Sequence, residues 1–370
     1  MKTQKTKHNL VFVEMFHKLE VRVTMRKMIY MAIASTGLLI LFLFGVTSIC
    51  LAQIEKWSKK ADMPTPRSNI SSCVLNDKII VAGGMLEDLT STSTVEEYDA
   101  KTDKWSQKVD MPAERDSMGI SVVNGKLYAI GGISGCDEPT SLVEEYNPAT
   151  NKWTRKADMP TARLGLSTSV ANGRIYAIGG ATGRGQDCMW WSGVSTVEEY
   201  NPVADKWTTK SDMPTPRAFF STCEANGKIY AIGGFSYGVF STVEEYDPVT
   251  DTWIKKKDMP TLRCNFATAS VNGKIYAVGG EAPTGFTPIL EEYDPLKDEW
   301  TRKTDMPTPR SKIACSAVND RLYIIGGCTS EASLAISVVE EYDPGFSDKI
   351  TSVDAKGKLV TSWGEIKSKH

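Results

Sequence analysis

The sequence predicts an all-β fold built from six copies of one four-stranded unit, because three kinds of residue recur with the same irregular spacing. Gly-Gly pairs, tryptophans and arginines each repeat at intervals of 48, 48, 54, 46 and 47 residues. The pairs begin at Gly83, Gly131, Gly179, Gly233, Gly279 and Gly326. The tryptophans are Trp57, Trp105, Trp153, Trp207, Trp253 and Trp300. Three markers that share one irregular spacing indicate an internal repeat and not chance similarity.

Each unit contains four segments that are typical of β-strands. In the second unit, Gly119–Val123 is followed by Asn124-Gly125 and then by Lys126–Ile130, which ends at the Gly pair. Asn-Gly between two β-rich segments predicts a tight hairpin, because both residues readily adopt a positive φ. A loop of variable length leads to the third segment, Val143–Tyr146, and a tryptophan-bearing fourth segment ends in Asp-Met-Pro.

The Gly pair, the later tyrosine and the tryptophan that follows it resemble the kelch repeat. The resemblance extends over residues 53–344. It implies a six-bladed β-propeller, in which each repeat forms one four-stranded blade around a central channel. Some kelch-type propellers are copper oxidases that need metal-binding histidines, and others act on sialic acids with Arg and Glu.

The phase of the markers predicts how the ring closes. Trp57 is a fourth-strand marker with no first three strands before it, and Tyr342 is a third-strand marker with no tryptophan at the expected spacing after it. We therefore expect the N-terminal strand Ile54–Asp62 to complete the blade formed by Ser311–Asp343. Such closure removes two unpaired strand edges.

The N-terminal region has the pattern of an export signal. Met28–Ala52 contains no Asp, Glu, Lys or Arg, and Arg26 and Lys27 precede it. Small residues stand at the positions that a signal peptidase requires for a cut before Gln53. The segment predicts a signal peptide or, as the alternative, an uncleaved transmembrane helix that anchors the protein. In both cases the rest of the chain is exported, to the periplasm or the extracellular space or facing outward from the membrane.

These observations divide the chain into four parts. We interpret residues 1–24 as an extension upstream of the true initiator, Met25, and residues 25–52 as the signal peptide or signal anchor. Residues 53–344 are the expected propeller, and residues 345–370 form a tail that departs from the repeat. The sequence provides no physical basis for assigning a role to the tail.

Composition excludes several classes of function for the propeller region. Residues 53–344 hold 31 basic and 40 acidic side chains, a net charge of −9, which argues against a nucleic-acid partner. The three histidines are His8, His17 and His370, all outside this region. Without histidine, a Gly-x-Ser-x-Gly motif or paired cysteines, we expect no catalytic triad, no metal site and no cofactor. We assign no catalytic residue.

The loops of the predicted blades alternate between two faces. The Met-Pro-x-x-Arg loops and the loops after the Gly pairs share one face, called here the loop face, and the Asn-Gly and Asp-Pro turns share the other, the turn face. The loops of the first face vary most, so it is the better binding surface. Its candidate ligand-binding aromatic residues are Trp190, Trp191, Tyr237, Phe240 and Phe286. They suggest a platform for a sugar ring or a peptide, unless they pack on their own blades.

Six arginines close the Met-Pro turns and form a second set of ligand-binding candidates. They are Arg67, Arg115, Arg163, Arg217, Arg263 and Arg310. The functional interpretation is an anion or carboxylate site around the channel mouth. The structural interpretation is that each arginine braces its turn and the neighbouring blade, and this one is favoured because every unit has the arginine whatever its loops contain.

We expect a monomeric, non-catalytic binding scaffold with a protein or glycan ligand on the loop face and membrane contact only through an uncleaved N-terminal segment. The alternative is a carbohydrate-active enzyme of the isomerase or lyase type that uses Arg, Glu or Tyr at the channel mouth. An enzyme needs polar residues that break the repeat, and the best are Lys312, Asn69, Asn265 and Asp116. An intracellular adaptor is a further alternative, against which the apolar N-terminus argues.

Cysteine placement leaves one candidate disulfide. Cys136 and Cys188 fall in loops on the same face of adjacent predicted blades, so they can pair in an exported protein. Cys73, Cys223 and Cys315 fall in the innermost strands, where we expect small buried side chains.

Overall fold

The computed structural model describes residues 56–135, 138–183, 192–330 and 335–345, and the backbone of a short ribbon of β27 (Ser352–Val353) and β28 (Leu359–Val360). The chain divides into two units, residues 1–52 and 53–370. The predicted signal segment lies outside the described residues. Within those residues there is no helix of the length and apolar character needed to cross a membrane.

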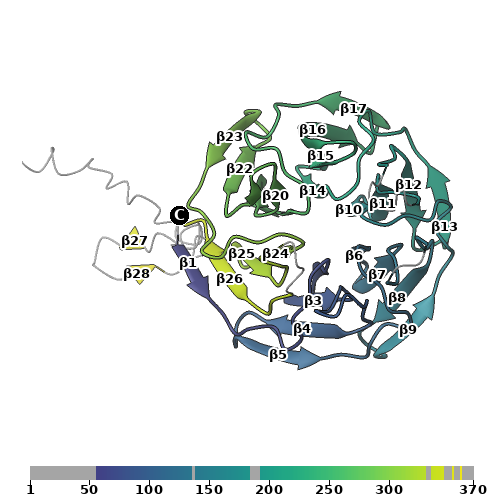
Figure 1. The fold of residues 1–370 in the computed structure, drawn as a ribbon, viewed down its shortest axis with the longest axis horizontal. Helices are drawn as coiled ribbons and strands as arrows, with labels where there is room; N and C mark the ends of the chain where they lie inside the picture. The colour runs from purple at the N-terminus through teal and green to yellow at the C-terminus, as the bar shows by residue number, and fades with distance from the viewer. Residues whose placement is uncertain are drawn as a thin grey trace, which may run out of the picture. The chain divides into compact units, whose positions relative to one another are not determined.

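Six four-stranded antiparallel sheets surround a central channel, so the fold is an all-β, six-bladed propeller (Figure 1). Blade 1 consists of β2 (Ser71–Leu75), β3 (Lys78–Ala82), β4 (Val95–Asp99) and β5 (Lys104–Gln107). Blade 2 consists of β6 (Gly119–Val123), β7 (Lys126–Ile130), β8 (Val143–Asn147) and β9 (Lys152–Arg155). Blade 3 consists of β10 (Ser167–Ala171), β11 (Arg174–Ile178), β12 (Val197–Asn201) and β13 (Lys206–Thr209).

Blades 4 to 6 continue the same order from the channel outward. Blade 4 consists of β14 (Ser221–Ala225), β15 (Lys228–Phe235), β16 (Val239–Asp247) and β17 (Thr252–Lys255). Blade 5 consists of β18 (Ala267–Val271), β19 (Lys274–Val278), β22 (Leu290–Asp294) and β23 (Glu299–Arg302), with a small ribbon of β20 (Glu281–Ala282) and β21 (Gly285–Phe286) in its loop. Blade 6 consists of β24 (Ala314–Val318), β25 (Arg321–Ile325), β26 (Val339–Asp343) and β1 (Lys56–Lys59).

The first hairpin of each blade forms for the reason that the sequence suggests. Asn124 and Gly125 have φ angles of 52° and 71°, which are the angles that a two-residue turn between right-twisted strands requires. Asn76 and Asp77 adopt φ angles of 53° and 61° in the same turn of blade 1. Asn and Asp therefore replace Asn-Gly there without a change of geometry, because both tolerate positive φ.

Neighbouring blades share their hydrophobic cores. The apolar side chains form six clusters, and each cluster combines residues of two adjacent blades. Between blades 6 and 1, for example, Ile79 and Val81 pack with Tyr323 and Ile325, all of them buried. Since a blade alone leaves one face of its sheet bare, the complete ring is the unit that buries apolar surface.

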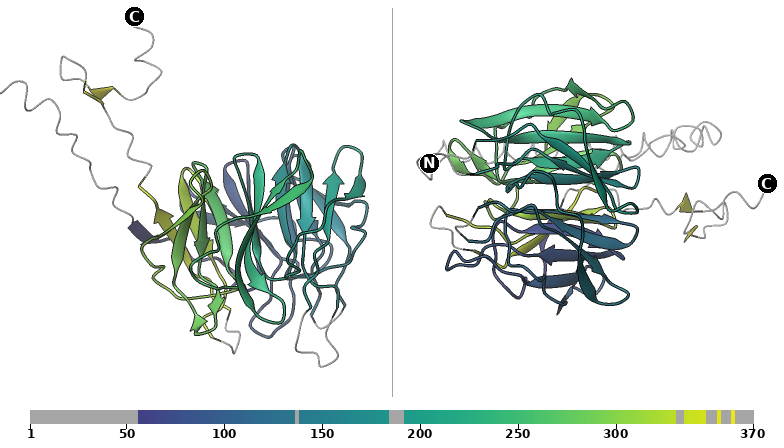
Figure 2. Two further views of the ribbon diagram at one scale, coloured as in Figure 1. Left: turned by 90° about the horizontal axis from the view of Figure 1, so that it is seen from above. Right: turned by 90° about the vertical axis from the view of Figure 1, so that its right-hand side faces the viewer.

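β1 is the outer strand of blade 6 although it precedes blade 1 in the chain. It pairs antiparallel with β26 over Lys56–Lys59, with Trp57 opposite Tyr342. The two rings lie 5.0 Å apart, the same distance as Tyr98 and Trp105 in blade 1. The Trp57 indole also donates a hydrogen bond to the Thr304 carbonyl of the preceding blade, at 3.0 Å. Figure 2 shows the ring from its edge.

Candidate functional site

The six repeated arginines are buried braces and not an accessible anion site. Each is at most 1% exposed and forms an ion pair with the first glutamate of the Glu-Glu-Tyr motif in its own blade. In blade 1, Arg67 Nη2 lies 2.6 Å from Glu96 Oε2, and Nη1 donates to the carbonyls of Gly83 and Thr94. Burial lowers the pKa of Arg67, while the Glu96 carboxylate opposes this shift. The anion-site interpretation of these arginines is therefore wrong, because their guanidinium groups already contact protein acceptors.

The second glutamate of the motif binds cationic side chains close to the turn face. Glu292 Oε1 accepts from Lys274 at 2.7 Å, and its other oxygen accepts from Tyr276 at 2.7 Å and lies 3.1 Å from Lys303 Nζ. Equivalent ion pairs recur at Glu97, Glu145, Glu199, Glu245 and Glu341. Both glutamates of every repeat are thus structural, and repetition by itself does not indicate chemistry at these positions.

A closed ring of backbone hydrogen bonds surrounds the channel on the loop face. It is formed by the residue two positions after each arginine, and we call these six residues the mouth ring: Asn69, Ser117, Gly165, Phe219, Asn265 and Lys312. Each N–H donates to the carbonyl of the mouth-ring residue in the preceding blade, at 2.8 to 3.2 Å. All six have φ between 49° and 57°. This conformation costs a residue other than glycine about 1 kcal/mol or more, and such strain is concentrated at functional sites.

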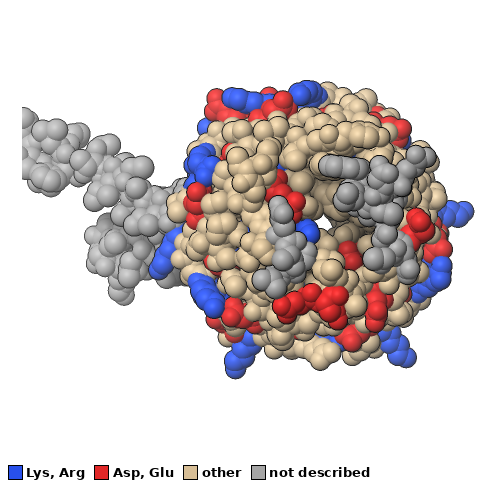
Figure 3. Space-filling model, in the orientation of Figure 1, with Lys and Arg blue, Asp and Glu red and all other residues tan. Residues whose placement is uncertain are grey.

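The mouth ring lines a polar opening at the channel mouth. With the inner strands it surrounds a cavity of about 190 Å³, to which Ser71, Ser167 and Ser221 also contribute. Figure 3 shows this opening in the centre of the loop face. The mouth-ring side chains differ from blade to blade, although the backbone around them repeats. Phe219 fits because the next member is Gly165, where a Cβ atom would lie 2.8 Å from the Phe219 ring.

Asp116 stands beside the mouth ring in blade 2 and is almost completely buried. Its two carboxylate oxygens accept hydrogen bonds from the hydroxyls of Ser91 and Ser117, each at 2.7 Å. Burial raises the pKa of Asp116, and the two serines and Lys312 oppose this shift. The Gly135 N–H donates to Ser91 Oγ, so these contacts connect the loops of blades 1 and 2.

A second carboxylate, Glu281, occupies the corresponding region of blade 5, three blades away in the ring of six. Its oxygens accept from Ser311 Oγ at 2.8 Å and from Asn265 Nδ2 at 3.3 Å. Lys312 is half-buried, its charge acts on Cys264 together with that of Glu281, and its ammonium forms no ion pair within the described part of the chain. Three of the four polar residues that the sequence singles out, Lys312, Asn69 and Asn265, therefore line the cavity. The fourth, Asp116, is buried behind it and accepts a hydrogen bond from Ser117, which lines the cavity.

The aromatic candidates divide into three groups. Tyr237 is 85% exposed at the tip of the β15–β16 hairpin, where it has a φ of 58°. Phe240 and Phe286 are half-buried in the loops of blades 4 and 5. Trp190 and Trp191 lie outside the described residues, so their role stays a prediction. Among the three aromatic candidates that the structure describes, Tyr237 is the most exposed.

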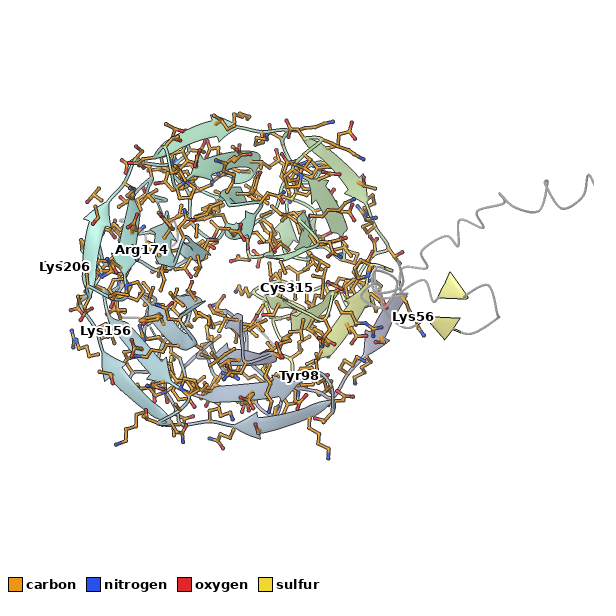
Figure 4. The ribbon with its side chains drawn as sticks, turned by 180° about the vertical axis from the view of Figure 1, so that it is seen from behind. Lys56, Tyr98, Lys156, Arg174, Lys206 and Cys315 are labelled. Atoms are coloured by element: carbon orange, nitrogen blue, oxygen red, sulfur yellow. The ribbon has the colours of Figure 1, made fainter. Side chains whose placement is uncertain are left out.

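The described cysteines are free thiols. Cys73, Cys223, Cys264, Cys315 and Cys328 form no disulfide with one another. Burial raises the pKa of Cys223 and of Cys264 to about 12, so both thiols stay protonated at neutral pH. Figure 4, a view of the turn face, places Cys315 at the inner end of its blade and Lys56, Lys156 and Lys206 at the outer side of the ring. The candidate pair Cys136 and Cys188 lies outside the described residues.

Three residues of the site escaped the sequence analysis: Glu281, Phe219 and Ser311. Glu281 could have been found by comparing the six repeats position by position. The residues that form a β-bridge with the residue directly after each repeated arginine are Met85, Ile133, Ala181, Phe235, Glu281 and Cys328. Glu281 is the one charged residue among these six, so it differs in chemistry from its counterparts in the other blades.

Comparison with known proteins agrees with this architecture. The profile of the KLHDC2/KLHL20/DRC7 Kelch-repeats domain matches residues 41–234 and 156–327, and that of the Kelch motif matches residues 309–347. No curated protein matches the chain. A solved structure, that of YjhT, is 19% identical with a TM-score of 0.66, and the match covers 76% of this chain and 96% of the other. At that identity the likeness shows the fold alone. Because the two profiles together cover most of the propeller, the chain belongs to the kelch-repeat β-propeller family.

Proposed function

We propose that the protein is an exported, non-catalytic binding scaffold whose loop face takes a protein or glycan ligand at the channel mouth. The kelch propeller supports a binding or scaffold role. The proposed position of the ligand site rests on one observation. The side chains that differ between repeats gather around the mouth ring, whereas the repeated Arg, Glu, Tyr and Trp side chains pack within and between the blades. Residues that vary on a repeated scaffold are free to specify a ligand.

The test is a peptide and glycan array probed with the full chain and with variants of the aromatic candidates. Replacing both Trp190 and Trp191 by Ala should abolish binding and leave thermal stability unchanged. Replacing Tyr237 by Asn should weaken binding in the same way, since Asn tolerates the φ of 58° at this position. A loss of stability with unchanged affinity would mean that these rings belong to the core, and would remove the aromatic platform from the proposal.

A carbohydrate-active enzyme of the isomerase or lyase type is the second candidate function. Lys312 lines the small cavity, and the carboxyl groups of Asp116 and Glu281 accept hydrogen bonds from Ser117 and Asn265, which also line it, so the cavity favours a small polar substrate. The buried arginines cannot contribute, so an acid–base role would fall to these three groups. Incubation with a panel of sugars and uronic acids, followed by NMR, tests it. Turnover that disappears in Lys312→Asn would support an enzyme, and unchanged substrates across the panel would favour the scaffold.

Export, ring closure by β1 and a monomeric state complete the proposal. The apolar segment Met28–Ala52 supports export, and the pairing of β1 with β26 supports a closing role for the N-terminal strand. N-terminal sequencing of the mature protein should begin at or near Gln53. A product that retains residues 25–52 would indicate a membrane anchor instead. Sedimentation of the mature protein should give the mass of one chain.

A further inference from the structure

The two sides of the channel mouth carry different chemistry on the loop face. Four exposed carboxylates stand in the loops of blades 1 and 2: Glu87, Asp88, Glu114 and Glu138. Residues 84–94 and 131–142 contain no Lys or Arg, and Arg115 in the connecting loop is buried in its ion pair with Glu144. Among the described residues, none of these four acids forms an ion pair. We call them the acidic rim. Figure 3 shows red side chains gathered below the central opening.

The opposite side of the opening carries aromatic side chains beside the hydrogen-bonded pair of Glu281 and Asn265. Blade 4 contributes the exposed Tyr237 and the half-buried Phe219 and Phe240, and blade 5 contributes the half-buried Phe286. Tyr237 and Phe219 both have φ above 50°, a conformation that is costly for bulky residues. At Phe219 the repeat itself sets this φ, since all six mouth-ring residues share it, but the repeat does not require a ring there, because the other blades have Asn, Ser, Gly or Lys. The aromatic side chain of blade 4 is therefore a departure from the repeat that a ligand can use.

The turn face lacks this division. Each blade places a Lys or Arg at the start of its second strand, and every one of these cations pairs with a Glu or Asp of the third strand. These six cations are thus compensated locally by carboxylates of their own blades. The four carboxylates of the acidic rim have no such partner among the described residues, so the loop face carries a negative field beside the proposed ligand site.

We propose that the partner of the loop face is a cationic polypeptide segment that also carries an aromatic side chain. This inference rests on the proposed binding function and names the chemistry of its ligand. Lys and Arg side chains of the partner would lie over the acidic rim, and the aromatic side chain would pack against Tyr237 at the other side of the mouth. A phosphate- or sulfate-bearing partner would be repelled by the same four carboxylates. A neutral glycan could stack on Tyr237 but would gain nothing from the acidic rim.

The test uses the full chain and three synthetic peptides of one length on a Gly-Ser background. The first carries lysines and one tryptophan, the second has glutamate in place of each lysine, and the third has alanine in place of the tryptophan. Fluorescence anisotropy gives the dissociation constants at about 50 mM and at about 300 mM salt, which differ in screening length. The Lys–Trp peptide should bind best, and its affinity should fall as the salt concentration rises.

Protein variants then assign the contacts. The rim variant combines Glu87→Gln, Asp88→Asn, Glu114→Gln and Glu138→Gln, and should weaken the Lys–Trp peptide about tenfold, since each exposed charge contributes modestly. The matched control removes exposed acids of the turn face by Asp77→Asn, Glu299→Gln and Asp320→Asn, and should change nothing. Tyr237→Asn should weaken the Lys–Trp peptide but not the peptide without tryptophan.

The outcomes separate this inference from the proposed function. Binding of the Glu–Trp peptide as tightly as the Lys–Trp peptide, or an unchanged affinity in the rim variant, would overturn the cationic partner, and a loss in Tyr237→Asn would still support a loop-face ligand. If a glycan binds with an affinity that does not depend on salt, and no peptide binds, the cationic partner is also overturned. Binding that is lost only in the turn-face control would overturn both proposals.

Discussion

Gly327 donates its backbone N–H to the carbonyl oxygen of Arg67 at 2.9 Å, and this hydrogen bond joins the last blade to the first. The same bond links each of the five other pairs of adjacent blades, for example Gly84 to Arg115 at 2.9 Å. The Gly pair and the arginine of the repeat therefore act together to join adjacent blades. The arginine guanidinium holds its own blade together, and its carbonyl holds the preceding blade.

Gly327→Ala should destabilise the protein strongly. Gly327 has a φ of 95°, and a Cβ atom there would overlap the Ile313 side chain and the Ser311 carbonyl oxygen. We expect a loss of more than about 3 kcal/mol in the free energy of unfolding, measured by urea denaturation. Gly125→Ala is the control, because Gly125 has a φ of 71° but no atom within 4 Å of the added Cβ. It should cost only about 1–2 kcal/mol. Equal losses in the two variants would mean that the inter-blade contact adds nothing.

Removing one member of a buried arginine–glutamate pair should cost far more than removing one of an exposed pair. Glu96→Gln leaves the Arg67 guanidinium buried without its counter-charge, and we expect a loss of about 3–5 kcal/mol. In the exposed pair of Lys59 and Asp62 the side chains are 67% and 43% exposed. Asp62→Asn should therefore change stability by less than about 1 kcal/mol. Similar melting curves for the two variants would contradict the bracing role of the arginines.

Deleting Gln53–Asp62 should destabilise the whole ring and not one blade. The deletion removes β1, exposes the edge of β26 and breaks the contacts of Trp57 with Tyr342 and Thr304. Because β1 connects distant parts of the chain, its loss should lower the melting temperature and promote aggregation. Calorimetry and light scattering measure both effects. A truncated protein that melts like the parent and stays monomeric would show that β1 does not close the ring.

The hydroxyl of Tyr98 should stabilise the fold in a pH-dependent manner. It donates to Asp103 Oδ1 at 2.6 Å, which lowers the pKa of that carboxyl. A lowered pKa in the folded state contributes stability above the unfolded value of about 3.9, and this contribution is lost as the pH falls through the folded value. Tyr98→Phe should thus cost about 1 kcal/mol at neutral pH and less below about pH 4.

A matched control exists in blade 2. There Tyr146 donates to Asn151 Oδ1 at 2.8 Å, and an amide does not titrate. The cost of Tyr146→Phe should therefore be the same at both pH values in urea denaturation. A pH-independent cost for Tyr98→Phe would rule out the Asp103 carboxylate as the source of the effect.

Sequence reasoning predicts those parts of the fold that repeat. The spacing of Gly83, Trp105 and Arg67 with their counterparts defines six blades, because identical local structures require identical residues at the same places. The Asn-Gly turns are predicted for the same reason, since few residues tolerate their φ angles. The profile matches and the six sheets confirm the kelch-type propeller.

The site is less predictable because it lies where the repeat is broken. Lys312, Asn69, Asn265 and Asp116 stand out by residue type, but nothing in their spacing shows that a ring of backbone hydrogen bonds holds them. The repetition of the arginines favours a bracing role, but only the structure shows that each is buried against the first glutamate of its own repeat. Burial of a long charged side chain depends on the neighbouring strands, which the local sequence does not specify.

The most direct test of the central claim measures the affinity of any ligand found on the array for a variant of the channel mouth. The double variant Glu281→Gln and Lys312→Asn keeps the backbone, because Asn occupies the equivalent mouth-ring position in blades 1 and 5 at φ of 49° and 52°. The account predicts that calorimetric titration will show at least about a tenfold loss of affinity with little change in melting temperature. Unchanged affinity in this variant, with a loss in the turn-face variant Asp77→Asn, Glu299→Gln and Asp320→Asn, would place the ligand on the other face and contradict the account.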